Sequence, residues 1–281
     1  MAQNKTIARE IRIAGTGVHS GKTAHLTLRP SDSGEIVFFR PDLENSRISL
    51  SVDRVECRNS TTLLGDKFKI RTIEHLLASL FAFGIRSLDI ELDADEVPIL
   101  DGSARPFVRD LEEAGRRDVG GEIPAIRIAK PFSVRENDAS IFFEPPASGE
   151  GLRLSYTIAF AHPIIGTESL SLDFGRDMFI REIAPARTFG FLKDVEMLRS
   201  QGLALGATFD NTIVLDNEKV LNGPLRFPDE FVRHKLLDLA GDLALLGRPL
   251  FGRISAHKAG HRLHLKGLQF LARNPDYWMP Q

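Results

Sequence analysis

The spacing of apolar residues along the chain changes from a strand-like to a helix-like period. In the first 70 residues, stretches at 7–13, 24–29 and 35–39 have strand composition or partial alternation, with Pro, Asp, Ser and Gly between them. These stretches predict β-strands joined by turns. From Thr72 apolar residues recur at helical spacing, and Gly84 predicts the C-terminal end of that helix.

The predicted elements follow a similar order in the two halves of the chain. Each half ends with a helix, a strand and a second helix, at 72–83, 87–92 and 105–114 in the first half and at 229–246, 250–256 and 261–272 in the second. The polar, glycine-containing stretch 115–124 predicts a linker, and 126–172 is rich in strand patterns. We therefore predict an α+β fold of two related domains, residues 1–120 and 121–281, each a β-sheet layered with α-helices. An insertion at about 190–215 alternates apolar and glycine residues around a short helix.

Composition limits the classes of function. The 281 residues are 42% hydrophobic and 26% charged, as in a globular protein with a sizeable core. The net charge of −2 gives no electrostatic reason to expect nucleic-acid binding. Cys57 is the single cysteine, so no disulfide within the chain is expected, which fits a reducing cytosol. No signal-peptide core and no run of about 18 apolar residues is visible, so we expect a soluble, cytoplasmic protein.

A polar stripe follows one face of the helix predicted at 229–246. His234, Asp238 and Asp242 fall together because residues four apart stack along a helix, whereas apolar residues take the opposite side. An imidazole and a carboxylate at this spacing can chelate one metal ion. From the stripe alone, a solvated polar face with a helical ion pair is the better interpretation.

Other histidines stand where they could complete such a site. His75, in the first turn of its predicted helix, projects away from the apolar stripe, so it is either exposed or directed across a cleft. Its neighbour Glu74 could act as a general base, and His261, at the start of the last helix, could protonate a leaving amine. Taken one at a time, each is better explained as a structural or solvated residue. His19 lies in the glycine-rich stretch 15–22, which could approach a ligand; on spacing alone, a hairpin with an incidental histidine is the better interpretation.

Six short motifs occur in order along the chain. They are Gly17–Lys22, Thr72–Leu77, Pro98–Ala104, Ala186–Phe191, Phe231–Asp238 and Lys258–His261. On these motifs the chain resembles the UDP-3-O-acyl-N-acetylglucosamine deacetylases, zinc enzymes of the first committed step of lipid A synthesis in Gram-negative bacteria. The resemblance covers the whole length.

The resemblance implies a chemical role for five residues. His75, His234 and Asp238 match the zinc ligands of the family. Glu74 matches its general base, and His261 matches the histidine that protonates the leaving glucosamine nitrogen. The implied reaction is zinc-dependent hydrolysis of the N-acetyl group of the UDP-sugar, which yields the free amine and acetate. The site is then expected at the interface of the two domains.

Further positions are carried over from the same resemblance. Thr188 matches the residue whose hydroxyl holds the oxyanion, and Asp242 matches the carboxylate that orients His261. His19 and Lys235 match polar residues near the substrate. In the family the inserted region forms a passage for the 3-O-acyl chain. The remaining expected substrate contacts are Phe160 for the uridine base and Phe189, Phe191, Leu192 and Phe209 for the acyl chain.

The resemblance also implies cofactor and partners. One catalytic Zn²⁺ is expected, with Fe²⁺ as the alternative in the cell, because both accept two imidazoles and a carboxylate. The expected partner is a small acylated UDP-sugar, with no nucleic acid and at most a transient membrane association through the acyl product. A monomer is the default expectation.

Two other functions remain to be weighed against the deacetylase. The first is a catalytically inactive protein of the same fold that binds nucleotide sugars or acyl chains. The second is a zinc hydrolase of another specificity, such as a peptidase. The peptidase motif His-Glu-x-x-His is absent, because Glu74 precedes His75 and their helix supplies one histidine only.

Overall fold

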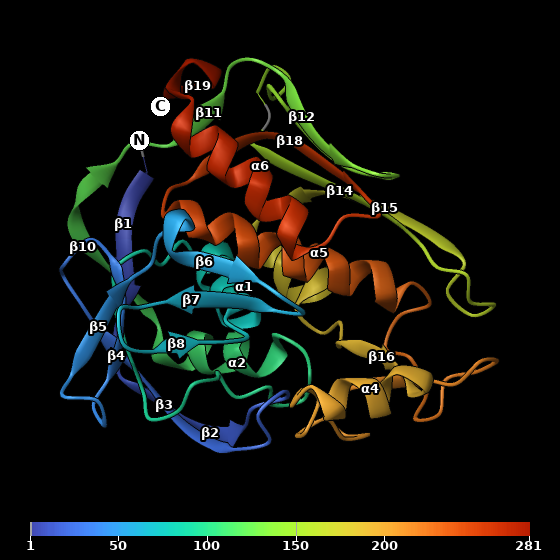
Figure 1. The fold of residues 1–281 in the computed structure, drawn as a ribbon. Coiled ribbons are helices and arrows are strands. Elements are labelled where there is room, and N and C mark those ends of the chain that lie inside the picture. The colour runs from blue at the N-terminus through green and yellow to red at the C-terminus, as the bar shows by residue number, and fades with distance from the viewer. Residues whose placement is uncertain (1, 150) are drawn as a thin grey trace.

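The N-terminal half is built on a five-stranded sheet. The computed structural model describes residues 2–149 and 151–281 and has a mixed α+β architecture (Figure 1). The sheet contains, from edge to edge, β2 (Ile11–Thr16), β3 (Thr23–Pro30), β9 (Leu88–Leu92), β4 (Ile36–Arg40) and β5 (Ser46–Ser49). The central strand β9 is antiparallel to β3 and parallel to β4. Two hairpins therefore flank one strand that arrives later in the chain.

The C-terminal half contains a seven-stranded sheet with a similar plan. Its strands are β12 (Phe132–Glu136), β13 (Ala139–Glu144), β18 (Leu250–His257), β14 (Leu152–Ala159), β15 (Thr167–Phe174), β11 (Ile126–Ile128) and β19 (Trp278–Pro280). Here β18 is antiparallel to β13 and parallel to β14, as β9 is to β3 and β4. The strand order β12-β13-β18-β14-β15 thus repeats the order β2-β3-β9-β4-β5 of the first sheet. Two further strands are added: β11 pairs with β18, and β19 pairs with β11.

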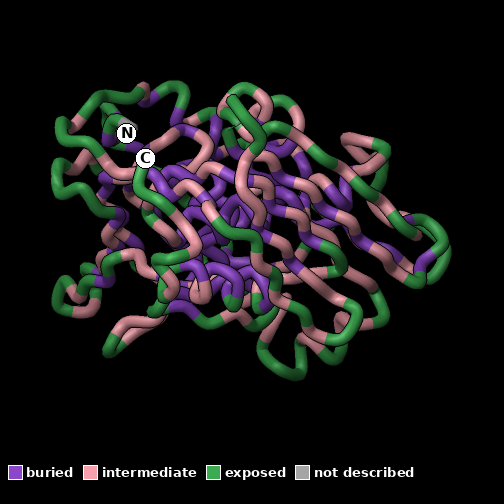
Figure 2. Tube along the Cα trace, turned by 90° about the horizontal axis from the view of Figure 1, so that it is seen from above, coloured by how far each residue is buried: buried purple, intermediate pink, exposed green. Residues whose placement is uncertain are grey.

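Helices fill the space between the two sheets. The longer ones are α1 (Glu74–Phe83), α2 (Arg105–Ala114), α5 (Glu230–Leu243) and α6 (His261–Arg273), and the short ones are α3 (Arg176–Met178) and α4 (Val195–Ser200). Helix α1 packs against α5, and α5 and α6 cover strands of the seven-stranded sheet. Both α1 and α5 are buried on most sides, as expected for helices at the centre of a molecule. Figure 2 shows this buried centre surrounded by exposed loops.

Smaller sheets surround this centre. One contains β6 (Val55–Cys57), β7 (Thr61–Leu64) and β8 (Lys69–Ile70), a second pairs β16 (Phe189–Phe191) with β17 (Ile213–Leu215), and a third pairs β1 (Ala2–Ile7) with β10 (Arg116–Ile123). The expected insertion at about 190–215 corresponds to β16, α4 and β17 (Figure 1). Among the described helices, none combines the length and the hydropathy needed to cross a membrane.

Two local predictions are wrong. The stretch 115–124 is not an irregular linker, because most of it forms β10 and pairs with β1. Its polar composition reflects exposure of most side chains of β10, which is held to β1 by backbone hydrogen bonds rather than by buried side chains of its own. The stretch 7–13 is not one strand, because Ala8, Arg9 and Glu10 are all exposed and form a bend between β1 and β2. The helix predicted at 72–83 is confirmed as α1 (Glu74–Phe83), and Gly84 caps its C-terminal end in the left-handed conformation.

The close approach of α1 and α5 depends on a glycine. A Cβ atom built on Gly241 would lie 2.2 Å from the Glu74 carbonyl oxygen and 2.8 Å from the carbonyl carbon. No real side chain tolerates such contacts with backbone atoms, so only glycine lets the two helices touch at this point. The contact places the first turn of α1, which carries Glu74 and His75, directly beside the polar stripe of α5.

We expect Gly241→Ala to be destabilising even though alanine is the better helix former. Helix propensity alone favours alanine by about 1 kcal/mol, but overpacking typically costs roughly 1–3 kcal/mol, and a shift of about 1 Å in catalytic groups costs roughly 10²-fold in rate. The checks are urea unfolding and kcat. Gly175→Ala is the control, since an added Cβ there meets nothing within 4 Å. Equal stability and activity of the two variants would contradict the packing argument.

Candidate metal centre and catalytic site

The polar stripe of α5 is buried. His234 and Asp238 are each 3% exposed and Asp242 is 1% exposed. The alternative of a solvated polar face is therefore excluded. His75 is 4% exposed and reaches the stripe from α1. It is therefore not exposed but directed at residues of the neighbouring helix, the second of the two expected alternatives. Helical spacing identified the right face of α5, but the second helix that covers it was not visible in the sequence.

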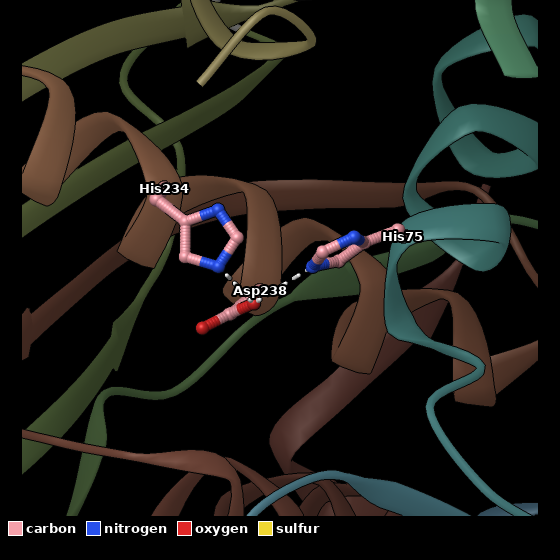
Figure 3. Close-up of side chains that lie close together, drawn as sticks. All are labelled: His75, His234 and Asp238. Carbon is pink, nitrogen blue, oxygen red and sulfur yellow. Dashed lines mark ion pairs between the residues drawn. The ribbon is translucent and has the colours of Figure 1, made fainter. Parts of the chain in front are cut away.

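Two imidazoles converge on one carboxylate (Figure 3). His234 Nε2 lies 3.5 Å and His75 Nε2 lies 3.8 Å from Asp238 Oδ1, and one ligand atom from each residue lies within 4.8 Å of the others. Ligands of a tetrahedral zinc at about 2.05 Å are separated by about 3.3 Å. The spacing is too long for direct hydrogen bonds and is close to that of three ligands around one ion. The residues therefore fit a metal site.

The other ring nitrogens differ in their surroundings. His234 Nδ1 lies 3.2 Å from the Ala186 carbonyl oxygen, which can accept its proton and leave Nε2 free to bind a metal. His75 Nδ1 is buried and has no hydrogen-bond partner among the described residues. The Ala186 contact is the kind of outer support that fixes the tautomer of a metal ligand.

The charge states also suit a cation. Burial, together with the neighbouring His234, lowers the pKa of His75 to about 3, and burial lowers the pKa of His234, so both rings are neutral near pH 7. Burial alone would raise the pKa of Asp238, but the charges of Lys235 and His234 more than offset it and lower that pKa well below its usual range. Neutral imidazoles and an ionised carboxylate are the forms that bind metal ions.

Glu74 lies beside this cluster with an unusual acidity. It is buried in the first turn of α1, and its Oε2 accepts a hydrogen bond from the Thr61 backbone N–H at 3.1 Å. Burial raises the pKa of Glu74 to about 7; the positive charge of His261 opposes this rise and Asp238 adds to it. A carboxyl that titrates near neutral pH is suited to take up and release a proton.

His261 is held in the opposite sense. Its Nδ1 lies 2.8 Å from Asp242 Oδ2, while its Nε2 faces the metal cluster, 3.7 Å from Asp238 Oδ2. Burial alone would lower the pKa of His261, but Asp242 and Asp238 together raise it to about 9. Burial likewise acts against ionisation of Asp242, and His261 outweighs it, so the pKa of Asp242 falls to about 2. At neutral pH this is an imidazolium paired with a carboxylate.

Two members of this network, Thr61 and His264, were not predicted from the sequence. Thr61 places its hydroxyl 2.6 Å from Asp242 Oδ1, and His264 places Nδ1 2.7 Å from Asp242 Oδ2. His264 also approaches the Tyr156 hydroxyl through Nε2 at 3.1 Å. The group Asp242, His261 and His264 has the composition of a second metal site, but these hydrogen bonds already use both carboxylate oxygens. The spacing of His261 and His264, three apart on one helix, could have indicated it; Thr61 gave no signal.

A cavity of about 430 Å³ opens onto these groups. It brings together most of the predicted site residues, namely Glu74, His75, His234, Asp238, His261, Thr188, His19, Lys235, Phe160 and Phe189. Lys235 pairs with Asp238 Oδ2 at its edge. Phe191 packs on Phe160, with ring centroids 5.8 Å apart, but does not line this cavity. Leu192 and Phe209 also lie outside the lining, 49% and 60% exposed, so their contact with an acyl chain stays a prediction.

The glycine-rich stretch 15–22 forms a hairpin loop between β2 and β3, and His19 points into the cavity. Glu96, which the sequence did not single out, accepts hydrogen bonds from the backbone N–H groups of His19 and Ser20 at 2.9 and 2.7 Å. A Cβ on Gly17 would lie 2.3 Å from Glu96 Oε2, so a larger residue there would displace the Glu96 carboxylate. The hairpin is thus confirmed, and His19 lines the cavity from it.

Comparison with known proteins agrees with this geometry. Residues 4–273 match the family described as LpxC, UDP-3-O-acyl N-acetylglycosamine deacetylase. The chain belongs to this family. It is 43% identical over 280 residues to the UDP-3-O-acyl-N-acetylglucosamine deacetylase of Thermodesulfovibrio yellowstonii, which covers 99% of this chain and 94% of the relative. The corresponding enzyme of Saccharophagus degradans is 43% identical over 286 residues, covering 99% and 93%, and that of Myxococcus xanthus is 44% identical over 276 residues, covering 97% and 87%.

Membership of the LpxC family gives the activity. The protein is a deacetylase of lipid A biosynthesis that hydrolyses the N-acetyl group of UDP-3-O-acyl-N-acetylglucosamine, and the family is zinc-dependent. The alternatives of an inactive binding protein and of a peptidase are set aside. The cluster of His75, His234 and Asp238 is consistent with the metal that this activity requires.

Proposed function

We propose that His75, His234 and Asp238 hold the single catalytic Zn²⁺ of the deacetylase. The convergence of their ligand atoms in one buried cluster between α1 and α5 is the observation that carries the proposal. When bound, the ion supplies a Lewis acid that polarises the acetyl carbonyl and acidifies water. Fe²⁺ is the alternative occupant, because the same ligand set suits it.

Glu74 and His261 then divide the proton transfers. Glu74 takes a proton from the attacking water, and protonated His261 delivers one to the departing glucosamine nitrogen. Support comes from their environments: burial raises the pKa of Glu74 to about 7, and Asp242 and Asp238 outweigh burial to raise that of His261 to about 9. Near neutral pH the base is partly ionised and the acid is protonated, which are the forms that the reaction needs. Asp242 keeps His261 oriented through the 2.8 Å contact.

The remaining cavity residues bind and orient the substrate. Thr188 lines the cavity and offers a hydroxyl to the oxyanion that forms at the acetyl carbon, and Lys235 and His19 offer polar contacts. Phe160 is assigned to the uridine base. The acyl chain is assigned to the apolar side chains of the insertion, Phe189, Phe191, Leu192 and Phe209.

We further infer the organisation of the whole protein. The shared order of five strands in the two sheets supports two related domains, residues 1–120 and 121–281, with the catalytic site at their interface. The protein acts as a cytoplasmic monomer on a small acylated UDP-sugar, without nucleic acid, and touches membranes only through its acylated product. Sedimentation velocity of the purified protein tests the monomer.

The dependence on the acyl chain tests the substrate assignment. We expect acetate release from UDP-3-O-acyl-N-acetylglucosamine to exceed that from unacylated UDP-N-acetylglucosamine, because burial of each methylene contributes about 0.8 kcal/mol. The measurement is kcat/KM for both compounds with the same zinc-loaded protein. Equal values would contradict an acyl-binding insertion, and no acetate from either would contradict the proposed function.

The pH profile of kcat/KM is expected to be a bell. Activity requires ionised Glu74, so it rises with pH through the raised pKa of Glu74, about 7; it requires protonated His261, so it falls as pH passes about 9. A bound dication lowers both pKa values and moves the bell to lower pH without changing the order of its limbs. Because Glu74 and His261 interact, the apparent pKa values of the two limbs belong to the pair and not to either residue alone. A profile that falls throughout the neutral range as pH rises would contradict the assigned roles.

A further inference from the structure

A buried ion pair joins the segment before β16 to the first turn of α5. Glu230, fully buried, accepts hydrogen bonds at Oε1 from the Arg187 backbone N–H at 3.0 Å and from Arg187 Nε at 2.9 Å. Its Oε2 accepts from Arg187 Nη2 at 3.1 Å and from the Arg226 backbone N–H at 2.6 Å. One carboxylate therefore receives four donors, and a two-point guanidinium contact of this kind fixes direction as well as distance.

The Arg226 side chain extends the network to the turn at 98–104. Its Nη2 donates to Asp101 Oδ2 at 3.0 Å, and its Nη1 lies 3.2 Å from Ser103 Oγ and 2.8 Å from the Pro185 carbonyl oxygen. Two cations and two carboxylates balance in charge. The segment that includes Pro185 and Arg187 is thus held between α5 and a turn of the first half of the chain.

The two residues next to Arg187 serve the catalytic site. On one side, the Ala186 carbonyl lies 3.2 Å from His234 Nδ1. On the other side, Thr188 lines the cavity, and its backbone N–H donates to the Gly102 carbonyl at 2.8 Å. A displacement of Arg187 would move both neighbours, because they share its backbone. The ion pair thus fixes the positions of the Ala186 carbonyl, which supports His234, and of the Thr188 hydroxyl in the cavity.

We propose that Glu230 is a positioning residue for the deacetylation, acting through Arg187 to fix the Thr188 hydroxyl and the Ala186 carbonyl that orients His234. The inference rests on the proposed roles of Thr188 and His234. A structural ion pair makes a different prediction. Buried pairs are often dispensable for fold specificity, and breaking one costs stability without a selective effect on the chemical step.

The first test is Glu230→Gln, which keeps the shape and removes the charge. We expect kcat to fall roughly 10- to 100-fold, with KM unchanged, and the affinity for Zn²⁺ measured against a chelator to fall by a similar factor. Glu182→Gln is the matched control. It breaks another ion pair of α5, Arg233 Nη1 to Glu182 Oε2 at 2.8 Å, that does not touch Arg187. Arg187→Lys, which retains the charge but lacks the forked geometry, should lower kcat in the same direction.

A double-mutant cycle separates positioning from general damage. If Glu230 acts through Thr188, the loss from Glu230→Gln is smaller in a Thr188→Ala background than in the wild type. Multiplicative losses, or a Glu230→Gln protein that matches Glu182→Gln in both kcat and zinc affinity, would overturn the inference. Failure of the proposed roles has a different signature, because then Thr188→Ala keeps the wild-type kcat or His234→Ala keeps its zinc. The zinc measurement on Glu230→Gln decides between positioning and structural roles even in that case.

Discussion

Replacing either proton-transfer residue is expected to lower kcat/KM by roughly 10²- to 10⁴-fold. Glu74→Gln keeps the hydrogen-bonding shape next to Thr61 but cannot accept the water proton, and His261→Gln cannot hold the proton that the departing amine needs. Glu74 is buried and His261 is partly buried, and both line the cavity beside the metal cluster. The measurement is acetate release under saturating zinc.

The two variants should differ in the pH profile as well as in rate. Glu74→Gln removes the group whose ionisation gives the acidic limb, so that limb is lost, and His261→Gln removes the group whose deprotonation gives the basic limb, so that limb is lost. Zinc content should stay at the wild-type level, because neither residue belongs to the ligand cluster. A near-wild-type rate in either variant would remove that residue from the mechanism.

Loss of a metal ligand is expected to be at least as severe. His75→Ala and His234→Ala each remove one of the three converging ligands, and a metal ion contributes several kcal/mol to the transition state, or roughly 10³-fold in rate. Both proteins should be purified with little zinc. His25→Ala is the control, since His25 is an exposed histidine paired with Asp93 on the surface. Full zinc content in either ligand variant, measured by atomic absorption, would contradict the assignment.

The candidate catalytic residues were predictable where they lie close together in the sequence. The spacing of His234 and Asp238 is set by one helix, so their convergence follows from helical geometry. Glu74 and His75 are consecutive in the chain, so their closeness also follows from the sequence. His75 was a candidate third ligand because it projects from the polar side of its helix, but only the resemblance singled it out among the eight histidines, because spacing does not tell which of them reaches α5.

Long-range contacts were the part that sequence patterns did not reveal. Thr61 supports both Glu74 and Asp242 from a small sheet far away in the chain, and the pattern of β7 carries no mark of this. Glycine weakens a helix by its intrinsic propensity, yet Gly241 is the residue that lets α1 meet α5. Segment 115–124 looked like a linker because its strand is stabilised by backbone pairing with β1, which leaves the side chains free to be polar.

The central claim is that one metal ion, held by His75, His234 and Asp238, is required for the deacetylation. The most direct measurement is acetate release from UDP-3-O-acyl-N-acetylglucosamine as chelator-treated protein is titrated with Zn²⁺. We expect no activity without metal, a linear rise as Zn²⁺ is added, and a plateau at one equivalent per chain. Full activity of the metal-free protein, or an unchanged titration in His234→Ala, would contradict the claim.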